Sequence, residues 1–405
     1  MQPSTAHIMV EASPSPDDTA ATGVKTWTLQ DCIEYALKEN ISLKQSRLSE
    51  ESAMIDRKTA KNALFPSLSF STSQALINRP YQDSGSTVSG TEIIHTENST
   101  SYTGNYGLDA RWDLYAGGRN RKTIKQEDIN IRIAGLDIEN SANSIMENIA
   151  QVYVQILYAD ESVKVNENTL EVSRAQCARG KELLEAGSIS AADYAQLQAQ
   201  VSNDNYQLVS ARATLQDYKL QLKQLLELEG PEEMSLLLPH IDESLILSPL
   251  PDKEAVFQNA MGIRPEIESG RLDISVAELD VKIAKSSYYP TLSLSAGIGT
   301  NHTSGTDFTF GEQIKNGWNN SVGLTLSVPI FSNRQTRSAV EKAELQLEST
   351  KLSFVETRKE LYRTIENLWL DAYSAQQQYA AATEQVMSSK TSYDLVSEQF
   401  NLGMK

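Results

Sequence analysis

The chain contains one sequence pattern twice, and this internal duplication constrains its fold more than any other feature. Residues 62–70 (NALFPSLSF) parallel residues 286–294 (SSYYPTLSL), which places Pro66 opposite Pro290 at an offset of 224 residues. Farther along, the offset is 216 and stays constant: Gly107 corresponds to Gly323, Leu114 to Ile330, Tyr115 to Phe331, Ile124 to Val340 and Gly187 to Gly403. The sequence therefore predicts two equivalent halves, whose difference of eight residues lies between Pro66 and Gly107.

Each half is predicted to contain a helix, a strand, a long loop, a second strand and a long helix. In the first half, Thr28 and Asp31 have the spacing of a capping box, so a helix is expected to begin there. Pro66 is expected to end this helix, because proline cannot continue a helical hydrogen-bond pattern.

Residues 108–114 alternate between apolar and polar side chains, as a strand with one dry and one wet face does. The apolar set is Leu108, Ala110, Trp112 and Leu114, and the polar set is Asp109, Arg111 and Asp113. The second half shows apolar residues at the alternate positions Val322, Leu324, Leu326, Val328 and Ile330. Leu68 with Phe70, and Leu292 with Leu294, begin two further strands, so four strands per chain are predicted.

After Gly117 and Gly118, which fit a turn between strand and helix, the apolar period changes from two to seven. One series is Ile124, Ile131, Ile138, Ile145 and Val152, and the other is Ile149, Ile156, Val163, Leu170, Cys177 and Leu184. These are the a and d positions of a coiled coil. A helix over residues 121–186 would be about 100 Å long at ~1.5 Å per residue, which no compact domain requires.

A tight turn is predicted to follow this helix. Gly187 stands where a helix end favours a left-handed residue, and Ser190 with Asp193 supplies a new capping signal. We therefore divide the chain into four parts. They are a tail (1–26), a first repeat (27–229) with strand pair 67–116 and helical hairpin 119–229, a connector (230–251), and a second repeat (252–405) with strand pair 290–332 and helix 335–402.

The formal charge of −17 disfavours a nucleic-acid partner, because phosphate backbones attract basic proteins. No run of about 18 apolar residues is present, so any insertion into a membrane is expected to use strands. The first 26 residues contain one basic residue, Lys25, and no apolar core, so we expect no signal peptide within this chain.

No catalytic, cofactor-binding or metal-binding residues are predicted, and the chain is not expected to be an enzyme. The four histidines are scattered and are expected to be loop or surface residues: His7, His95, His240 and His302. Cys32 and Cys177 define neither a disulfide framework nor a metal-ligand spacing, and both are interpreted as ordinary helix residues. Nucleotide-binding and nucleophile-elbow motifs are missing from the sequence.

Several segments, taken in order, resemble the TolC family of outer-membrane efflux proteins. Residues 29–43 (LQDCIEYALKENISL) look like that family's opening helix, with Asn40 at its Asn-Pro position although Ile41 replaces the proline. Residues 113–119 (DLYAGGR) look like its strand-to-helix junction, and residues 329–335 (PIFSNRQ) keep that frame without the glycines. The resemblance spans residues 27–405.

The resemblance implies an α+β membrane protein and no cofactor. Three chains would each contribute four strands to one twelve-stranded β-barrel, continued by long helices that form an α-barrel across the periplasm of a Gram-negative bacterium. Closure by other subunits also follows from physics, because four strands leave two bare edges that lipid cannot pair. The implied function is the passive exit duct of a tripartite efflux pump or a type I secretion system, with a periplasmic adaptor and an inner-membrane transporter as partners.

Site residues follow from the same resemblance. Adaptor docking is expected at the periplasmic tips, formed by Leu184, Gly187, Ser190, Asp193, Phe400 and Gly403. Contact with outer-membrane lipid is expected for Leu108, Trp112, Leu114, Leu324 and Leu326. Gly117 and Gly118 are expected to form the strand-to-helix turn.

Two alternatives explain only part of the pattern. A periplasmic adaptor also carries a long helical hairpin, but it would not repeat the strand-and-helix unit at a constant offset. A coiled-coil adhesin or scaffold explains the heptads and leaves the alternating strands unexplained. Because the first returning helix is expected to end near Glu229, the offset predicts at least about 40 equivalent residues after Lys405. The sequence does not indicate whether the cargo is a drug, a metal or a protein.

Overall fold

The computed structural model describes residues 26–78, 85–89, 92–96, 100–228, 234–237 and 246–403. The chain divides into two compact units. Unit 1 contains Met1–Asn40 and Ser144–Ile241, and unit 2 contains Ile41–Asn143 and Asp242–Lys405. Unit 1 therefore takes its repeat residues from the first repeat alone, whereas unit 2 combines segments of both repeats.

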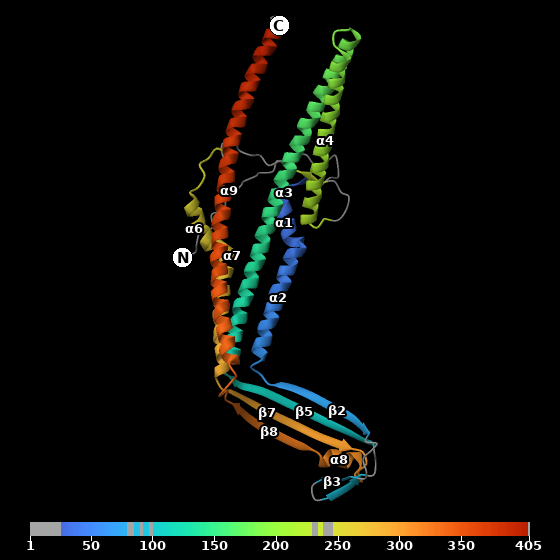
Figure 1. The fold of residues 1–405 in the computed structure, drawn as a ribbon, viewed down its shortest axis with the longest axis vertical. Helices are drawn as coiled ribbons and strands as arrows, with labels where there is room; N and C mark the ends of the chain where they lie inside the picture. Colours follow the sequence, from blue (N-terminus) through green and yellow to red (C-terminus); the bar gives the residue numbers. More distant parts are fainter. Residues whose placement is uncertain are drawn as a thin grey trace, which may run out of the picture. The chain divides into compact units, whose positions relative to one another are not determined.

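Unit 2 contains a four-stranded antiparallel sheet in the order β2-β5-β7-β8, which confirms the four predicted strands (Figure 1). The first repeat supplies β2 (Ser67–Asn78) and β5 (Thr100–Ala116), and the second supplies β7 (Thr291–Thr303) and β8 (Asn319–Ser327). The two repeats meet at the central pair β5 and β7, whereas β2 and β8 form the edges. The duplication thus produces two hairpins that lie side by side in one sheet.

The two long loops expected within the strand pairs contain structure of their own. Between β2 and β5 lies a hairpin of β3 (Gly85–Ser89) and β4 (Glu92–Thr96). Between β7 and β8 lies α8 (Phe310–Asn316), which a capping box of Thr309 and Glu312 begins. Thr309 has the same Thr-x-x-acid spacing as Thr28, so the sequence did contain the signal for this helix.

The long helices of unit 2 include α2 (Ile41–Asn62), α6 (Lys253–Ile263), α7 (Pro265–Lys285) and α9 (Gln335–Asn401). A short 3-10 turn, Ser286–Tyr288, connects α7 to β7. Helix α7 packs closely on α9, where a Cβ atom on Gly270 would lie 2.7 Å from the Phe354 ring.

Unit 1 contains β1 (Thr26–Trp27), α1 (Leu29–Glu39), α4 (Ala191–Leu225), β6 (Ser235–Leu236) and the second part of α3 (Arg119–Glu185). Strands β1 and β6 pair in parallel, so the connector contributes a strand as well as irregular chain. Six heptad residues of α3 are buried: Ile145, Ile149, Val152, Ile156, Val163 and Leu170. Ile124, Ile131 and Ile138 are only half-buried.

The opening helix is broken in both repeats, which corrects the prediction of one helix from Thr28 to Pro66. Asn40 has an extended backbone (φ −57, ψ 130) between α1 and α2, and its side-chain amide donates a hydrogen bond to the Leu225 carbonyl at 3.1 Å. At the equivalent position, Arg264 has nearly the same backbone (φ −69, ψ 126) between α6 and α7. Here the cause is local, because Pro265 disfavours a helical conformation in the residue before it.

A second pair of equivalent contacts attaches the start of each repeat to its long helix. The Tyr153 hydroxyl on α3 donates to the Trp27 carbonyl at 3.4 Å, and the Trp369 indole on α9 donates to the Pro251 carbonyl at 3.1 Å. Both donors and both acceptors correspond at the offsets of the duplication. In unit 1 the Tyr153 hydroxyl also donates to the Leu237 carbonyl, and burial raises the pKa of Tyr153.

Candidate functional site

The four-stranded sheet has two chemically different faces. Directly paired residues of antiparallel strands share a face, so the register assigns the sides. Along one row of pairs, Trp112 lies beside Leu294, and Leu294 lies beside Leu324. The apolar face consists mainly of Leu68, Phe70, Leu76, Leu108, Trp112, Leu292, Leu294, Ile298, Val322, Leu324 and Leu326.

The opposite face of the sheet is polar. Asp109 lies beside Gly297, and Gly297 lies beside Ser321. The remaining members are mostly small: Ser67, Ser69, Ser71, Ser73, Arg111, Asp113, Ser293, Ser295, Gly323 and Thr325. Both faces are exposed in this chain, including the apolar one, where Leu324 is 64% exposed and Val322 is 79% exposed. An uncovered apolar surface of this extent indicates a non-aqueous environment or a partner.

The strict alternation predicted for residues 108–114 ends one residue early. The register of β5 against β7 shifts between Asp113 and Tyr115, so Leu114 is the extra residue of a β-bulge. Tyr115 rather than Leu114 is the partner of Leu292. Of the five residues expected to face lipid, Leu108, Trp112, Leu324 and Leu326 share the apolar face, and Leu114 stands at the bulge.

Aromatic residues border the apolar face at the end that carries α8. His302 on β7 lies among Tyr102, Tyr106 and Phe310, with ring centroids 4.9 to 5.9 Å away. At the other end of the strands, exposed aromatic side chains are Phe65, Tyr115, Tyr288, Tyr289 and Phe331. Two aromatic zones that enclose an apolar band are typical of strands in an outer membrane.

His302 is not the loop or surface residue that was predicted, since it lies within β7 and is 9% exposed. The reason is its cross-strand neighbour Gly104, where an added Cβ atom would lie 2.2 Å from the His302 ring. Glycine leaves room for the ring to lie flat over β5. His95 belongs to β4, and His7 and His240 lie outside the described residues.

Two left-handed residues form the turn from strand to long helix in each repeat. Gly117 and Gly118 have φ of 62 and 75, and the equivalent residues Asn333 and Arg334 have φ of 45 and 65. A Cβ atom on Gly117 would lie 2.4 Å from the Ser286 carbonyl oxygen, whereas Gly118 has space around it. Only Gly117 is therefore required to be glycine by its surroundings as well as by its backbone.

The first tip contains the predicted cap residues in one short turn between α3 and α4. Gly187 has φ of 72, and the Ser188 and Gly187 amides donate to the Leu183 and Leu184 carbonyls at 2.8 and 2.9 Å. This is a Schellman cap. Ser190 and Asp193 then form a reciprocal capping box, and hydrogen bonds from Ser190 lower the pKa of Asp193.

The second predicted tip, at the end of α9, has the same local geometry. Gly403 has φ of 70, and its amide donates to the Phe400 carbonyl at 3.0 Å, as Gly187 does to Leu184. The described residues thus include the helix end and left-handed residue of both tips. Docking of an adaptor at either tip is a separate question and stays a prediction.

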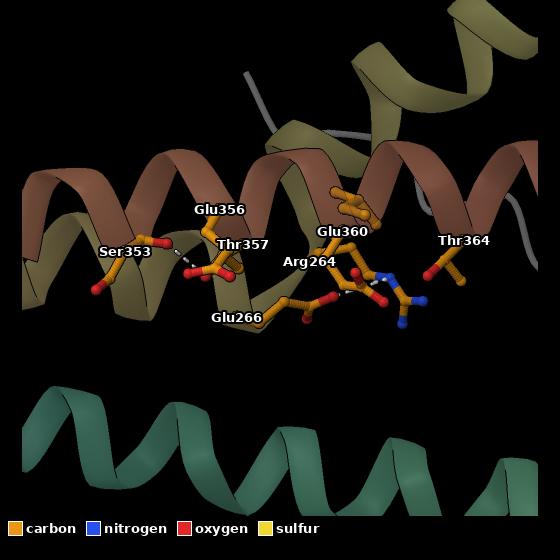
Figure 2. Close-up of a pocket in the computed structure, with 8 residues that line it drawn as sticks. Arg264, Glu266, Ser353, Glu356, Thr357, Glu360 and Thr364 are labelled. Atoms are coloured by element: carbon orange, nitrogen blue, oxygen red, sulfur yellow. Dashed lines mark hydrogen bonds and ion pairs between the residues drawn. The ribbon is translucent and has the colours of Figure 1, made fainter.

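An acidic hollow lies at the helix break of the second repeat. Figure 2 shows side chains of α9 gathered on the side where Arg264 and Glu266 lie. The lining residues are Arg264, Glu266, Ser353, Glu356, Thr357, Glu360, Leu361 and Thr364. Arg264 pairs with Glu266 at 3.4 Å, and Glu360 pairs with Arg363 of its own helix at 2.5 Å. The sequence analysis did not identify this hollow, because its residues come from helices far apart in the chain.

Two aspartates in the helices of unit 2 have raised pKa values. Burial raises the pKa of Asp137 on α3 and of Asp273 on α7, and the charge of Asp137 raises the pKa of Asp273 further. Over the described residues, no group of three or more His, Cys, Asp or Glu side chains is placed to hold a metal ion. Within the same part of the chain, no helix is both long and apolar enough to cross a membrane.

The fold defines a class of protein: a duplicated strand-and-helix chain whose sheet has an exposed apolar face. The family model described as outer membrane efflux protein matches residues 32–227 and 256–405. The chain therefore belongs to the outer membrane efflux protein family. This membership supports the channel interpretation over the periplasmic adaptor alternative.

Relatives and solved structures agree with this assignment. The chain is 23% identical to the alkaline protease secretion protein AprF of Pseudomonas aeruginosa, over 90% of this chain and 73% of AprF. It is 23% identical to the outer membrane protein TolC of Escherichia coli, over 93% of this chain and 74% of TolC. Its fold is similar to the outer-membrane channel CmeC of Campylobacter jejuni, with a TM-score of 0.72 and 19% identity over 93% of this chain and 77% of CmeC.

Proposed function

We propose that this chain is one protomer of a trimeric outer-membrane channel that serves as a passive exit duct for efflux or secretion. The observation that supports it most directly is the exposed apolar face of the β2-β5-β7-β8 sheet, bordered at both ends by aromatic residues. Lipid is the environment that such a face fits, because burial of its leucines in hydrocarbon is favourable. The polar serine-rich face would then line a water-filled lumen.

The edges of the sheet support the trimer. Strands β2 and β8 each have one side without a strand neighbour in the described sheet. In hydrocarbon the backbone groups of a bare edge cost several kcal/mol each, roughly the cost of an unmade hydrogen bond in an apolar medium. Three copies that pair β8 of one with β2 of the next would remove every edge and form a twelve-stranded barrel.

The long helices would continue the duct into the periplasm and join it to a periplasmic adaptor and an inner-membrane transporter. AprF is named for secretion of a protease, and BepC of Brucella suis is named an outer membrane efflux protein. These names support a duct that is general in its cargo. We therefore propose efflux or secretion without choosing between them.

Fractionation and electrophoresis test this function. The protein, expressed with an export signal, is expected in the outer-membrane fraction as a trimer whose migration changes on heating, and to conduct ions in a planar bilayer. A soluble periplasmic monomer without conductance would instead favour the adaptor or scaffold alternatives.

Docking at the tips requires its own test. A photo-crosslinking residue in place of Ser188, beside Gly187, is expected to couple to the adaptor encoded with this protein. A matched control is the same residue in place of Leu237, which is exposed in the connector. Crosslinks from position 237 but not from position 188 would contradict docking of the adaptor at the tip. The proposed channel function would still stand.

A further inference from the structure

The seam between α3 and α4 contains one buried polar layer among apolar ones. Toward the tip, Gly180 approaches α4 so closely that an added Cβ atom would lie 2.3 Å from Leu197. Away from the tip, the buried residues of the two helices include Leu170 and Leu208. Asp204 lies between these levels on α4 and is only 7% exposed. A carboxylate in a helix seam destabilises the seam unless its oxygens are paired.

One oxygen of Asp204 is paired and the other is not. The Gln200 amide donates to the Asp204 Oδ1 atom at 2.8 Å. The Oδ2 atom is buried and has no hydrogen-bond partner among the described residues. Buried polar atoms nearly always have a partner, and a carboxylate oxygen can only be satisfied by a donor.

Asp204 lines a groove of about 450 Å³ along the hairpin. Its lining residues are Asn168, Thr169, Val172, Ser173, Gln176, Gln200 and Asp204. Two hydroxyls of this lining already donate to backbone: Thr169 to the Val165 carbonyl at 2.9 Å, and Ser173 to the Leu170 carbonyl at 3.1 Å. The groove therefore offers oxygen acceptors around Asp204, and among the described residues no donor reaches its Oδ2 atom.

The charge and composition of the groove select the kind of ligand. A single carboxylate balances one positive charge, whereas Ca²⁺ and Mg²⁺ sites generally combine several charged oxygens. Zinc and related metals prefer nitrogen or sulfur ligands, which this lining does not contain. The exposed side chain of Val172 adds an apolar wall. Arg212, farther along α4, is paired with Glu167 at 2.7 Å.

We propose that the Asp204 groove binds an ammonium or guanidinium group through the Asp204 carboxylate. The charged group donates to the carboxylate and to the neighbouring amide and hydroxyl oxygens, and its alkyl part lies against Val172. The group belongs either to a free organic cation or to a lysine or arginine of a protein that packs on the hairpin. All contacting residues lie on one hairpin, so the proposal does not depend on the proposed channel function.

The test uses n-butylammonium chloride with the full chain in detergent, and sodium chloride at equal ionic strength as the reference. At a concentration about tenfold above its Kd, butylammonium should raise the melting temperature by roughly 2 to 4 °C. It should also slow amide hydrogen exchange in residues 168–176 and 200–204. The substitution Asp204→Asn should weaken this binding at least about tenfold, because a charged hydrogen bond is lost.

The matched control is Asp217→Asn. Asp217 lies on the same helix and accepts from Gln221 at 2.9 Å, as Asp204 does from Gln200, but Asp217 is exposed. This variant should bind butylammonium like the unaltered chain. No butylammonium-specific change in melting or exchange in the unaltered chain, or an equal response in Asp204→Asn, would overturn the proposal. The exchange experiment on the unaltered chain decides the matter even if Asp204→Asn does not fold.

Carbodiimide coupling in isolated outer membranes then separates the two sources of the cation. An amide between Asp204 and a lysine, identified by mass spectrometry and absent in Asp204→Asn, assigns the group to a protein side chain. Butylammonium binding without such a crosslink assigns the groove to a free organic cation.

Discussion

The two repeats reach the same backbone geometry with different side chains. After the strand pair, the first repeat has Gly117 and Gly118 and the second has Asn333 and Arg334, yet all four residues are left-handed. The difference follows from the surroundings, because only Gly117 faces a backbone carbonyl where a Cβ atom would collide. Equivalent positions of a duplicated chain therefore conserve conformation, while the neighbours decide which residues can adopt it.

The breaks in the opening helices show the same relation. In the second repeat, Pro265 alone accounts for the extended residue before it. In the first repeat, Ile41 replaces that proline, and Asn40 bonds the Leu225 carbonyl from a segment 185 residues away. One repeat thus uses a local constraint and the other uses a tertiary contact for the same bend.

The largest effect is expected for Gly117→Ala. The left-handed backbone costs about 1 to 2 kcal/mol for alanine, and the collision with the Ser286 carbonyl adds about 1 to 3 kcal/mol. Gly118→Ala is the control, because it has a similar left-handed backbone and its Cβ atom would come no closer than 3.9 Å to the Lys122 side chain. Denaturant unfolding of both variants measures the difference. Equal losses of stability would show that the collision is relieved by movement of the turn.

The two repeats should respond alike to charge on the apolar sheet face. Leu108 and Leu324 are equivalent residues that share this face. Arginine at either position should cost about 2 to 4 kcal/mol if the face meets lipid near the bilayer midplane. Thr325→Arg, on the opposite face, is the control. The measurement is trimer yield in the outer membrane, and equal tolerance at positions 324 and 325 would contradict the lipid assignment.

The equivalent contacts to the Trp27 and Pro251 carbonyls should differ in strength. Tyr153→Phe removes a buried hydroxyl whose single proton lies between two carbonyl acceptors, and it should cost about 1 to 3 kcal/mol. Trp369→Phe removes one bond from a more exposed site and should cost less, about 1 kcal/mol. Denaturant unfolding of both variants and of the unaltered chain measures the two losses of stability and shows which is larger. A greater loss for Trp369→Phe would reverse this part of the comparison.

Mutations at the two helix breaks should also differ in their effect on stability. Asn40→Ala loses the bond to the Leu225 carbonyl and should destabilise the protein by about 1 kcal/mol. Arg264→Ala should change stability by no more than about 0.5 kcal/mol, because Pro265 still directs the backbone. Chemical denaturation provides both values. Similar losses at the two positions would mean that the Arg264 side chain, which pairs with Glu266, contributes more than its neighbouring proline.

The smallest effect concerns the pH dependence of the first tip. Because hydrogen bonds from Ser190 lower the pKa of Asp193 below its ordinary value of 3.8, the cap is fully present above that value. It is lost as the pH falls through the lowered pKa. Amide exchange at the start of α4 should therefore show greater opening at pH 3 than at pH 5, after correction for intrinsic rates. In Ser190→Ala this difference between pH 3 and pH 5 should shrink. An unchanged difference would show that the pH dependence does not come from the cap.

Local patterns in the sequence were sufficient for much of the fold. The duplication predicted two equivalent hairpins, the period of two located the strands, and the capping residues Thr28 and Ser190 located helix starts. These features depend on a few neighbouring residues, because backbone sterics and helix caps act over one turn. The same locality explains why the apolar set on β5 and β8 could be named from the sequence. Its contact with lipid and the docking at the tips stay predictions.

Other features required the tertiary structure. The burial of His302 depends on Gly104, which lies opposite it on another strand from the other repeat. The bulge at Leu114 depends on how β5 pairs with β7, and the break at Asn40 depends on the Leu225 carbonyl. The unpaired oxygen of Asp204 is visible only when α3 and α4 are packed. In each case the deciding partner is far away in the chain, so the sequence supplied the residue types while folding determined which of them met.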